Sequence, residues 1–210
     1  MENRKRFIRP LIICVAGMTT ILACGCAGKN RSDESHAWTA GEIPFYLNGE
    51  ANQAAENAVR DTFQMWDTAT HFSFVYMGRN RAGLRRDGKN TVSFLRKWPR
   101  GIPAGDVGYC MKWYDVNGNI VESDIILNLS LAKFTTAATN TPDSYYIEGV
   151  LSHEIGHLIG LGHIENETSL MKPLSPQGES YFMGRIDELT VEAYRKLYRG
   201  AVIQDTESGN

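Results

Sequence analysis

The chain has 210 residues, of which 42% are hydrophobic and 22% are charged, a composition that is ordinary for a globular protein of one domain. Its formal net charge is −2, from 22 Lys and Arg residues and 24 Asp and Glu residues. This balance argues against a nucleic-acid partner, which would require a strongly basic surface.

The first residues have the pattern of a secretory signal peptide. Four basic residues precede an apolar run from Leu11 to Ala23, which is too short to span a bilayer comfortably. We therefore expect residues 1–23 to be removed on export, with a short retained membrane anchor as the alternative. The remaining chain would keep 18 of its 22 basic residues and 23 of its 24 acidic residues.

Cys24 follows Ile21-Leu22-Ala23, and this tetrapeptide resembles the box at which bacterial lipoproteins are cleaved and lipidated. The resemblance implies that Cys24 becomes a lipidated N-terminus, with Cys26 as the weaker alternative. Residues 24–37 have the composition of a flexible linker. We expect an exported protein held by its lipid at the bacterial cell envelope, on the outer membrane or cell surface. A buried free Cys110 is favoured over a pair with Cys26.

Strand and helix patterns follow the linker. Ile43–Leu47 has strand composition, and Pro44 within it indicates an edge strand or the start of a strand. From Ala51 to about Ala69, the spacing predicts an amphipathic helix that buries Ala55, Val59, Phe63 and Trp66 against a sheet. Two more segments have strand composition, Phe72–Tyr76 and Thr91–Leu95.

Two segments are interpreted as loops. Residues 79–89 contain five basic residues and two glycines, which predicts a solvated loop, with a basic rim facing the substrate as the alternative. Residues 99–103 read Pro-Arg-Gly-Ile-Pro and predict a second loop.

A β-hairpin is predicted next, from Val107–Tyr114 and Ile120–Leu129 around the turn Asp115–Asn119, which contains Asn-Gly. The alternation Asp-x-Asn-x-Asn in this turn also raises a calcium site as an alternative. An EF-hand loop needs Gly at its sixth position and Glu at its twelfth, where this chain has Ile120 and Ile126. We therefore favour the hairpin, and the chain has no recognisable calcium site.

The segment His153 to His163 contains three of the five histidines. His153 and His157 are spaced i, i+4, so a helix presents both imidazoles on one face, where they can bind one Zn²⁺. Glu154 is offset around the helix and can act as general base on a metal-bound water. Gly160 can end the helix and return His163 as a third ligand, which leaves a fourth position open, as in catalytic zinc sites. A core helix with incidental histidines is the alternative.

The helix that carries this segment is predicted from about Asp143 to Ile159, with Thr141 as cap and Pro142 at its first position. A turn-rich loop with Met171 and Pro173 follows. A last helix begins at a Thr190 cap and buries Val191, Tyr194, Leu197 and Tyr198 before Gly200 ends it.

The segment His153–His163 resembles the signature HExxHxxGxxH of the metzincins, a clan of zinc endopeptidases, and Ser169 to Pro173 resembles the methionine turn of the matrixins. The resemblance implies an α+β fold: a twisted mixed β-sheet, a long zinc-binding helix, a methionine turn that places Met171 beneath the zinc, and a C-terminal helix. It also implies that residues 125–129 form the edge strand that pairs with an extended substrate, through Ile125, Ile126, Leu127 and Asn128.

Three features depart from the matrixin pattern. Ile164 stands where matrixins usually have serine after the third ligand. Only His36 and His71 remain for the family's second, structural zinc site, and they are not clustered in the sequence. The chain also shows no inhibitory pro-domain.

We therefore expect a zinc-dependent endopeptidase with one catalytic Zn²⁺, ligated by His153, His157 and His163, that acts on protein or peptide substrates. The catalytic domain is predicted over residues 38–200, with a polar tail over residues 201–210. Two alternatives are a zinc-binding surface lipoprotein without peptidase activity and a zinc hydrolase acting on a non-protein amide. An intact Glu154 favours an enzyme, because metal binding alone does not require that base.

Overall fold

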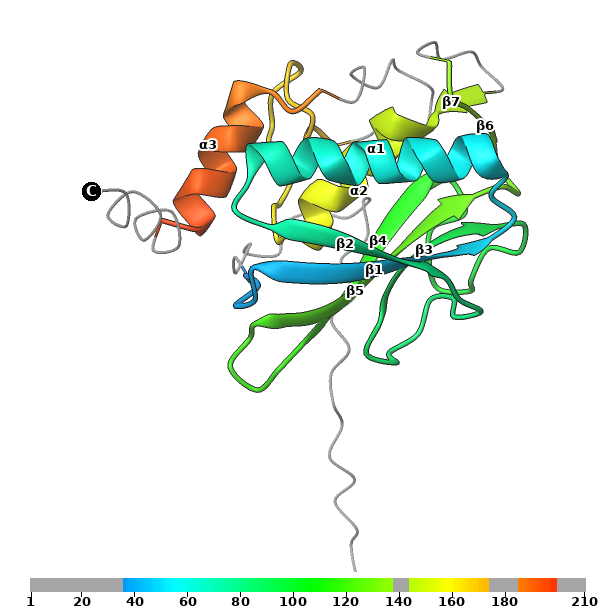
Figure 1. The fold of residues 1–210 in the computed structure, drawn as a ribbon. Helices are drawn as coiled ribbons and strands as arrows, with labels where there is room; N and C mark the ends of the chain where they lie inside the picture. Colours follow the sequence, from blue (N-terminus) through cyan, green and yellow to red (C-terminus); the bar gives the residue numbers. More distant parts are fainter. Residues whose placement is uncertain (1–35, 138–143, 174–184, 200–210) are drawn as a thin grey trace, which may run out of the picture.

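The computed structural model describes residues 36–137, 144–173 and 185–199. One five-stranded sheet carries two helices on the same face, and a third helix lies at one end of them (Figure 1). The predicted signal peptide, the lipidation site Cys24, most of the linker and the polar tail lie outside the described residues. No helix in the described ranges is long and apolar enough to cross a membrane.

The sheet has the strand order β2-β1-β3-β5-β4, from β1 (Glu42–Gly49), β2 (Ser73–Arg79), β3 (Asn90–Leu95), β4 (Gly108–Tyr114) and β5 (Ile120–Asn128). Only the β4–β5 pair is antiparallel, so the predicted mixed sheet is confirmed. The three strands predicted by composition and the two strands of the predicted hairpin are all present. Pro44 does not mark an edge, since β1 is paired on both sides. It is also the third residue of β1 and not its first, and it stands just before Phe45, where the ladder with β3 begins.

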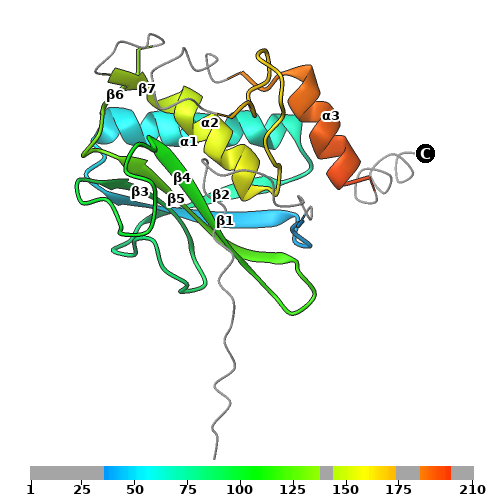
Figure 2. The same ribbon diagram turned by 180° about the vertical axis from the view of Figure 1, so that it is seen from behind.

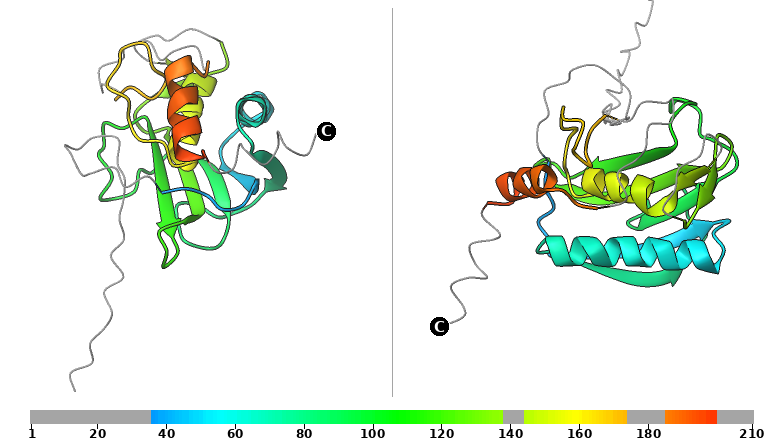
Figure 3. Two further views of the ribbon diagram at one scale, coloured as in Figure 1. Left: turned by 90° about the vertical axis from the view of Figure 1, so that its left-hand side faces the viewer. Right: turned by 90° about the horizontal axis from the view of Figure 1, so that it is seen from above.

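Helix α1 (Gln53–Ala69) covers the sheet as predicted. Asn52 caps it, because its side-chain oxygen accepts from the N–H of Ala55 at 2.9 Å. The predicted apolar face is buried, and the ring of Phe63 stacks on that of Phe45 at a centroid distance of 3.9 Å. Helix α2 (Ile147–Leu158) lies beside α1 over the same face (Figure 3), and the two are joined by a bond from Trp66 Nε1 to Ser152 Oγ of 3.1 Å.

The start of α2 differs from the prediction. Residues 144–146 are not helical: they form strand β7 (Ser144–Tyr146), which pairs in parallel with β6 (Lys133–Thr135). Two consecutive aromatic residues, Tyr145 and Tyr146, favour an extended backbone. They pair with Phe134 and Thr135 on β6. The predicted cap Thr141-Pro142 lies outside the described residues.

The β4–β5 hairpin is confirmed, and its turn is closed by Asp115. The carboxylate of Asp115 accepts from the backbone N–H of Asn117 and Asn119 and from the side-chain amide of Asn119. The amide of Asn119 is the main cause that lowers the pKa of Asp115. Gly118 has a φ of +84°, which glycine adopts without strain. The carboxylate of Asp115, which the calcium alternative would need as a ligand, thus accepts hydrogen bonds within the turn.

The prediction that residues 125–129 form an edge strand is wrong. Strand β5 lies between β3 and β4, and Ile125 is paired with Val92 on one side and with Cys110 on the other. Ile125, Ile126, Leu127 and Asn128 are all fully buried. The hairpin places β4 outside β5, so β4 is the edge strand. Cys110 on β4 is buried, as predicted, and its sulfur lies 3.2 Å from the hydroxyl of Ser123.

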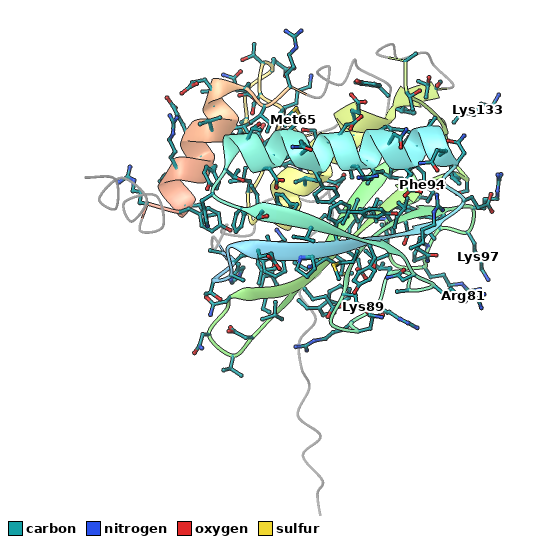
Figure 4. The ribbon with its side chains drawn as sticks, viewed as in Figure 1. Met65, Arg81, Lys89, Phe94, Lys97 and Lys133 are labelled. Carbon is teal, nitrogen blue, oxygen red and sulfur yellow. The ribbon has the colours of Figure 1, made fainter. Side chains whose placement is uncertain are left out.

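The basic loop between β2 and β3 is only partly solvated. Its arginine and lysine side chains are exposed, and Arg81 and Lys89 lie on the side of the sheet away from α1 (Figure 4). Its backbone is docked on two buried carboxylates of β5. The N–H groups of Asp87 and Gly88 donate to Glu122, and those of Arg85 and Thr91 donate to Asp124.

Helix α3 (Glu188–Leu197) begins earlier than predicted, because Asp187 caps it in place of Thr190. The carboxylate of Asp187 accepts from the N–H of Thr190 at 3.1 Å and from its hydroxyl at 2.7 Å. Tyr194 and Tyr198 are buried as expected, whereas the predicted end at Gly200 lies outside the described residues.

Candidate metal centre

Helix α2 buries three ionisable side chains in an otherwise largely apolar core. His153 and Glu154 are fully buried, and His157 is 4% exposed. The helix ends where the sequence predicts, since Gly160 has a φ of +95°. The N–H of Leu161 then donates to the carbonyl of Gly156 at 2.9 Å, which turns the chain back along the helix.

This turn brings His163 to the two helical histidines. The Nε2 atoms of His157 and His163 are 3.2 Å apart, and one ligand atom from each of the three imidazoles lies within 4.8 Å of the others. In the part of the chain that the structure describes, this is the one group of three or more His, Cys, Asp or Glu residues close enough to hold a metal ion.

Backbone carbonyls orient the two helical imidazoles. His153 Nδ1 lies 2.7 Å from the carbonyl oxygen of Leu170, and His157 Nδ1 lies 2.9 Å from that of Leu161. Because a carbonyl only accepts, each Nδ1 carries the proton, and each Nε2 presents a lone pair. His153 Nε2 is buried without a hydrogen-bond partner. Buried lone pairs that converge in this way fit a metal cation, and three imidazoles, two of them oriented by backbone carbonyls, are a donor set for zinc.

The electrostatics of the site also suit a metal. Burial, with a smaller contribution from the nearby His163, lowers the pKa of His153 to about 3. Burial also lowers the pKa of His157 well below its usual value, with added effects of His153, His163 and Lys112. Both imidazoles are therefore neutral at neutral pH, as metal ligands must be.

Met171 lies against the middle of α2. Its side chain is fully buried, and a Cβ at Gly156 would lie 2.3 Å from its sulfur. Gly156, between the two helical ligands, is thus the residue that admits Met171, and the sequence reasoning missed it. The signal was a glycine inside a helix, which costs stability unless packing requires it. The carbonyl of Met171 accepts from the N–H of Ile164 at 2.8 Å, which holds the returning strand of the loop.

Comparison with known families agrees with this geometry. The family model described as Matrixin (Peptidase_M10) matches residues 37–199. The chain belongs to the matrixin family. The three histidines are accordingly the zinc site of a matrixin metallopeptidase domain, and the predicted α+β fold, with His153 and His157 on α2 and His163 in the loop after it, is confirmed.

A curated relative supports the same assignment. The chain is 25% identical to human matrix metalloproteinase-19 over 164 residues, which cover 73% of this chain. The match spans only 28% of the length of that relative. The similarity therefore concerns the domain and not the whole of the longer protein.

The matrixin domain brings Glu154 next to the edge strand. A Cβ at Gly108, the first residue of β4, would lie 2.7 Å from Glu154 Oε1 and 2.9 Å from a methyl carbon of Val150. Gly108 was another residue that the sequence reasoning did not single out. Its lack of a side chain lets the carboxylate sit directly beside β4.

The two histidines outside the triad do not join a second metal group within the described residues. The ring of His36 bonds to the carbonyl of Gly118 at 2.8 Å, and that of His71 bonds to the hydroxyl of Tyr194. The carboxylates of Glu122 and Asp124 hold the loop over residues 80–89, as described above.

Three further contacts support the metal centre. Asp187, the cap of α3, accepts from the N–H of Leu170 at 2.6 Å, and the carbonyl of Leu170 accepts from His153. At the end of α2, Trp38 Nε1 donates to the carbonyl of Leu158 at 2.8 Å, and the hydroxyl of Tyr198 donates to that of Ile159 at 2.7 Å. The ligand-bearing helix is thus fixed at both its loop and its end.

Proposed function

We propose that this matrixin is a zinc-dependent endopeptidase that cleaves protein or peptide substrates laid along β4. The observation that carries the proposal is the position of Glu154. Its carboxylate is fully buried on the ligand-bearing helix and faces Gly108 at the start of the edge strand. Metal binding alone would not need a carboxylate there, whereas general-base catalysis does.

The chain's own residues divide the work of hydrolysis. His153, His157 and His163 would hold the metal, and zinc, when bound, supplies a Lewis acid and lowers the pKa of water toward 7. Glu154 would take a proton from the attacking water and deliver it to the amine nitrogen as the peptide C–N bond breaks. Such proton transfer typically contributes about 10²- to 10⁴-fold in rate.

Strand β4 is the substrate strand in this proposal, in place of residues 125–129. Strand β5 covers one side of β4, and no strand of the sheet covers the other. An extended peptide can add to such an edge through main-chain hydrogen bonds. Figure 2 shows β4 as the strand nearest to α2, so a peptide on that edge would pass the histidines.

The experiment compares full-length parent, Glu154→Gln and His157→Ala for zinc content and peptide hydrolysis. Glu154→Gln should keep one zinc per chain and lose about two to four orders of magnitude in rate. His157→Ala should lose metal and activity together. Glu165→Gln, an exposed change past the third ligand, is the matched control and should leave both unchanged.

Three results would contradict the proposal. A zinc-loaded parent that cleaves no member of a broad peptide library would favour the zinc-binding surface protein. If a non-protein amide were hydrolysed instead, the domain would be a different zinc hydrolase. Unchanged activity in Glu154→Gln would assign the proton transfer to another base.

We also propose that the protein is exported and tethered to the bacterial cell envelope through a lipid on Cys24. The support is the basic and apolar leader that ends at Leu22-Ala23-Cys24. Cys24→Ala should remain unlipidated and move to the soluble fraction. If the variant stays in the membrane fraction, the leader is a retained anchor.

A further inference from the structure

A lysine on the edge strand lies beside the metal centre. Lys112, near the end of β4, has a relative exposure of only 7%. Lysine is rarely this buried unless it is paired. Among the residues that the structure describes, however, Lys112 has no hydrogen bond and no ion pair.

The pleat of β4 directs Lys112 toward α2. Side chains on a strand alternate between its two faces, so Gly108, Cys110 and Lys112 share one face. Gly108 faces Glu154 on α2, and Cys110 belongs to the core beneath the helices. Lys112 is the next residue of this row, and it lies toward the C-terminal end of α2. The charge of Lys112 is felt at His157, where it helps to lower the pKa of the imidazole.

The ammonium group is the accessible part of this side chain. Lys112 Nζ is not among the buried polar atoms that lack a partner. Since it also has no partner in the described protein, it must reach solvent while its alkyl stem is covered. The structure therefore presents a fixed stem with a free positive head at the His157 side of the histidine triad.

We propose that Lys112 forms a carboxylate-binding subsite on β4 beside His157, which selects substrates carrying an Asp or Glu side chain near the cleaved bond. The inference rests on the proposed endopeptidase function. A peptide added to the edge of β4 would run past Lys112 and could present one side chain to its ammonium. A carboxylate there gains a charge-assisted hydrogen bond, and it also balances the positive potential of a lysine close to a metal site.

The exposed basic loop would not produce a preference for substrates that carry an Asp or Glu side chain near the cleaved bond. Two of its cations, Arg81 and Lys89, lie on the face of the sheet away from α1 (Figure 4), and a third, Arg79, is paired with Glu56 of α1. Exposed charges of this kind are screened by salt and contribute little to an individual contact. Lys112 differs because its stem is buried and its head is confined beside the ligands.

The first experiment measures specificity with the full-length, zinc-loaded protein. Pairs of C-terminally amidated peptides differ by Glu or Gln at one of three positions on each side of the cleaved bond. At one position the parent should show a kcat/KM for Glu about tenfold above that for Gln. Lys112→Met should bring this ratio close to one, Lys112→Glu should invert it, and Lys112→Arg should retain it. Lys97→Met, an exposed change on the loop after β3, should leave it unchanged.

The second experiment measures binding without turnover. In the Glu154→Gln background, calorimetry should show the same preference for the Glu peptide, and Lys112→Met should remove it while the zinc content stays constant. A ratio of one at all positions in the parent, or a preference that survives Lys112→Met, overturns the subsite. A binding preference in a protein that cleaves no peptide would keep the subsite and contradict the endopeptidase function.

Discussion

The loop before β3 and the loop after α2 are both fastened by side chains of a neighbouring regular element, with donor and acceptor exchanged. In residues 80–89, backbone N–H groups donate to the carboxylates of Glu122 and Asp124 on β5. In residues 161–171, backbone carbonyls accept from the imidazoles of His153 and His157 on α2.

The two regions differ in the hydrogen-bonding atoms that each side chain still has available. Glu122 and Asp124 each use both carboxylate oxygens on backbone N–H groups, so the loop consumes their hydrogen-bonding capacity. Each helical imidazole uses only Nδ1 on its loop and keeps Nε2 for a ligand. The first arrangement is structural, whereas the second fixes a loop and prepares a metal site with the same two rings.

The largest effect on stability is expected from removing a carboxylate that holds the loop over residues 80–89. Asp124→Ala leaves two backbone N–H groups without their acceptor and should lower the free energy of unfolding by about 2 kcal/mol. Asp124→Asn should cost less, because its amide oxygen can still accept. Denaturant unfolding measures both. The zinc content should stay at one per chain, since the histidine loop is untouched.

The control for this prediction is Asp61→Ala, an exposed change on α1 that should leave stability within about 0.5 kcal/mol. If Asp124→Ala also removed zinc, the two loops would not be independent, and the comparison would fail.

The two regions should respond to pH in opposite directions in the metal-free protein. Burial raises the pKa of Asp124 to about 7, so between pH 4 and 7 the folded state holds a proton that the unfolded state releases. This contribution to stability falls as pH rises. Burial lowers the pKa of His153 to about 3, so the unfolded state binds the extra proton below its usual pKa. That contribution falls as pH drops below about 6.5.

Asp124→Asn should therefore steepen the gain of stability with rising pH, by up to about 1.4 kcal/mol per pH unit. Urea unfolding at pH 4.5, 5.5 and 6.5 in the presence of a chelator measures the slope for parent and variant. An unchanged slope would show that Asp124 is ionised across this range in the folded protein.

The smallest effect on stability is expected at the contact between Gly156 and Met171, in the loop after α2. Gly156→Ala improves helix propensity by about 1 kcal/mol, but the new methyl group meets the Met171 sulfur. Overpacking of a core typically costs about 1–3 kcal/mol, so we expect a net loss of about 1 kcal/mol. The same change in a Met171→Ala background should cost nothing or stabilise. Equal losses in both backgrounds would locate the strain elsewhere.

The metal centre was largely predictable from the sequence. The offsets of His153, Glu154, His157, Gly160 and His163 fix a helix, a stop and a return, and each of these appears in the structure. Local periodicity also predicted α1 and the strands of the sheet, because amphipathic patterns report which face is buried.

What could not be predicted depends on contacts distant in sequence. Strand order decides that β4 and not β5 is the edge, and no local pattern in Ile125–Asn128 encodes its neighbours. The requirement for glycine at positions 108 and 156 arises from side chains that approach from another element. Likewise, the start of α2 was placed too early because β7 forms only where β6 pairs with it.

The contact between Trp38 and Tyr198 has a consequence for how the domain can be carried. The N–H of Trp38 donates to the hydroxyl of Tyr198 at 3.1 Å, so the first and last described parts of the fold meet at one point. Polypeptide attached at either end would leave from the same place. Because the two ends of the domain lie together, the domain can be joined to or inserted into a longer chain without rearranging its core.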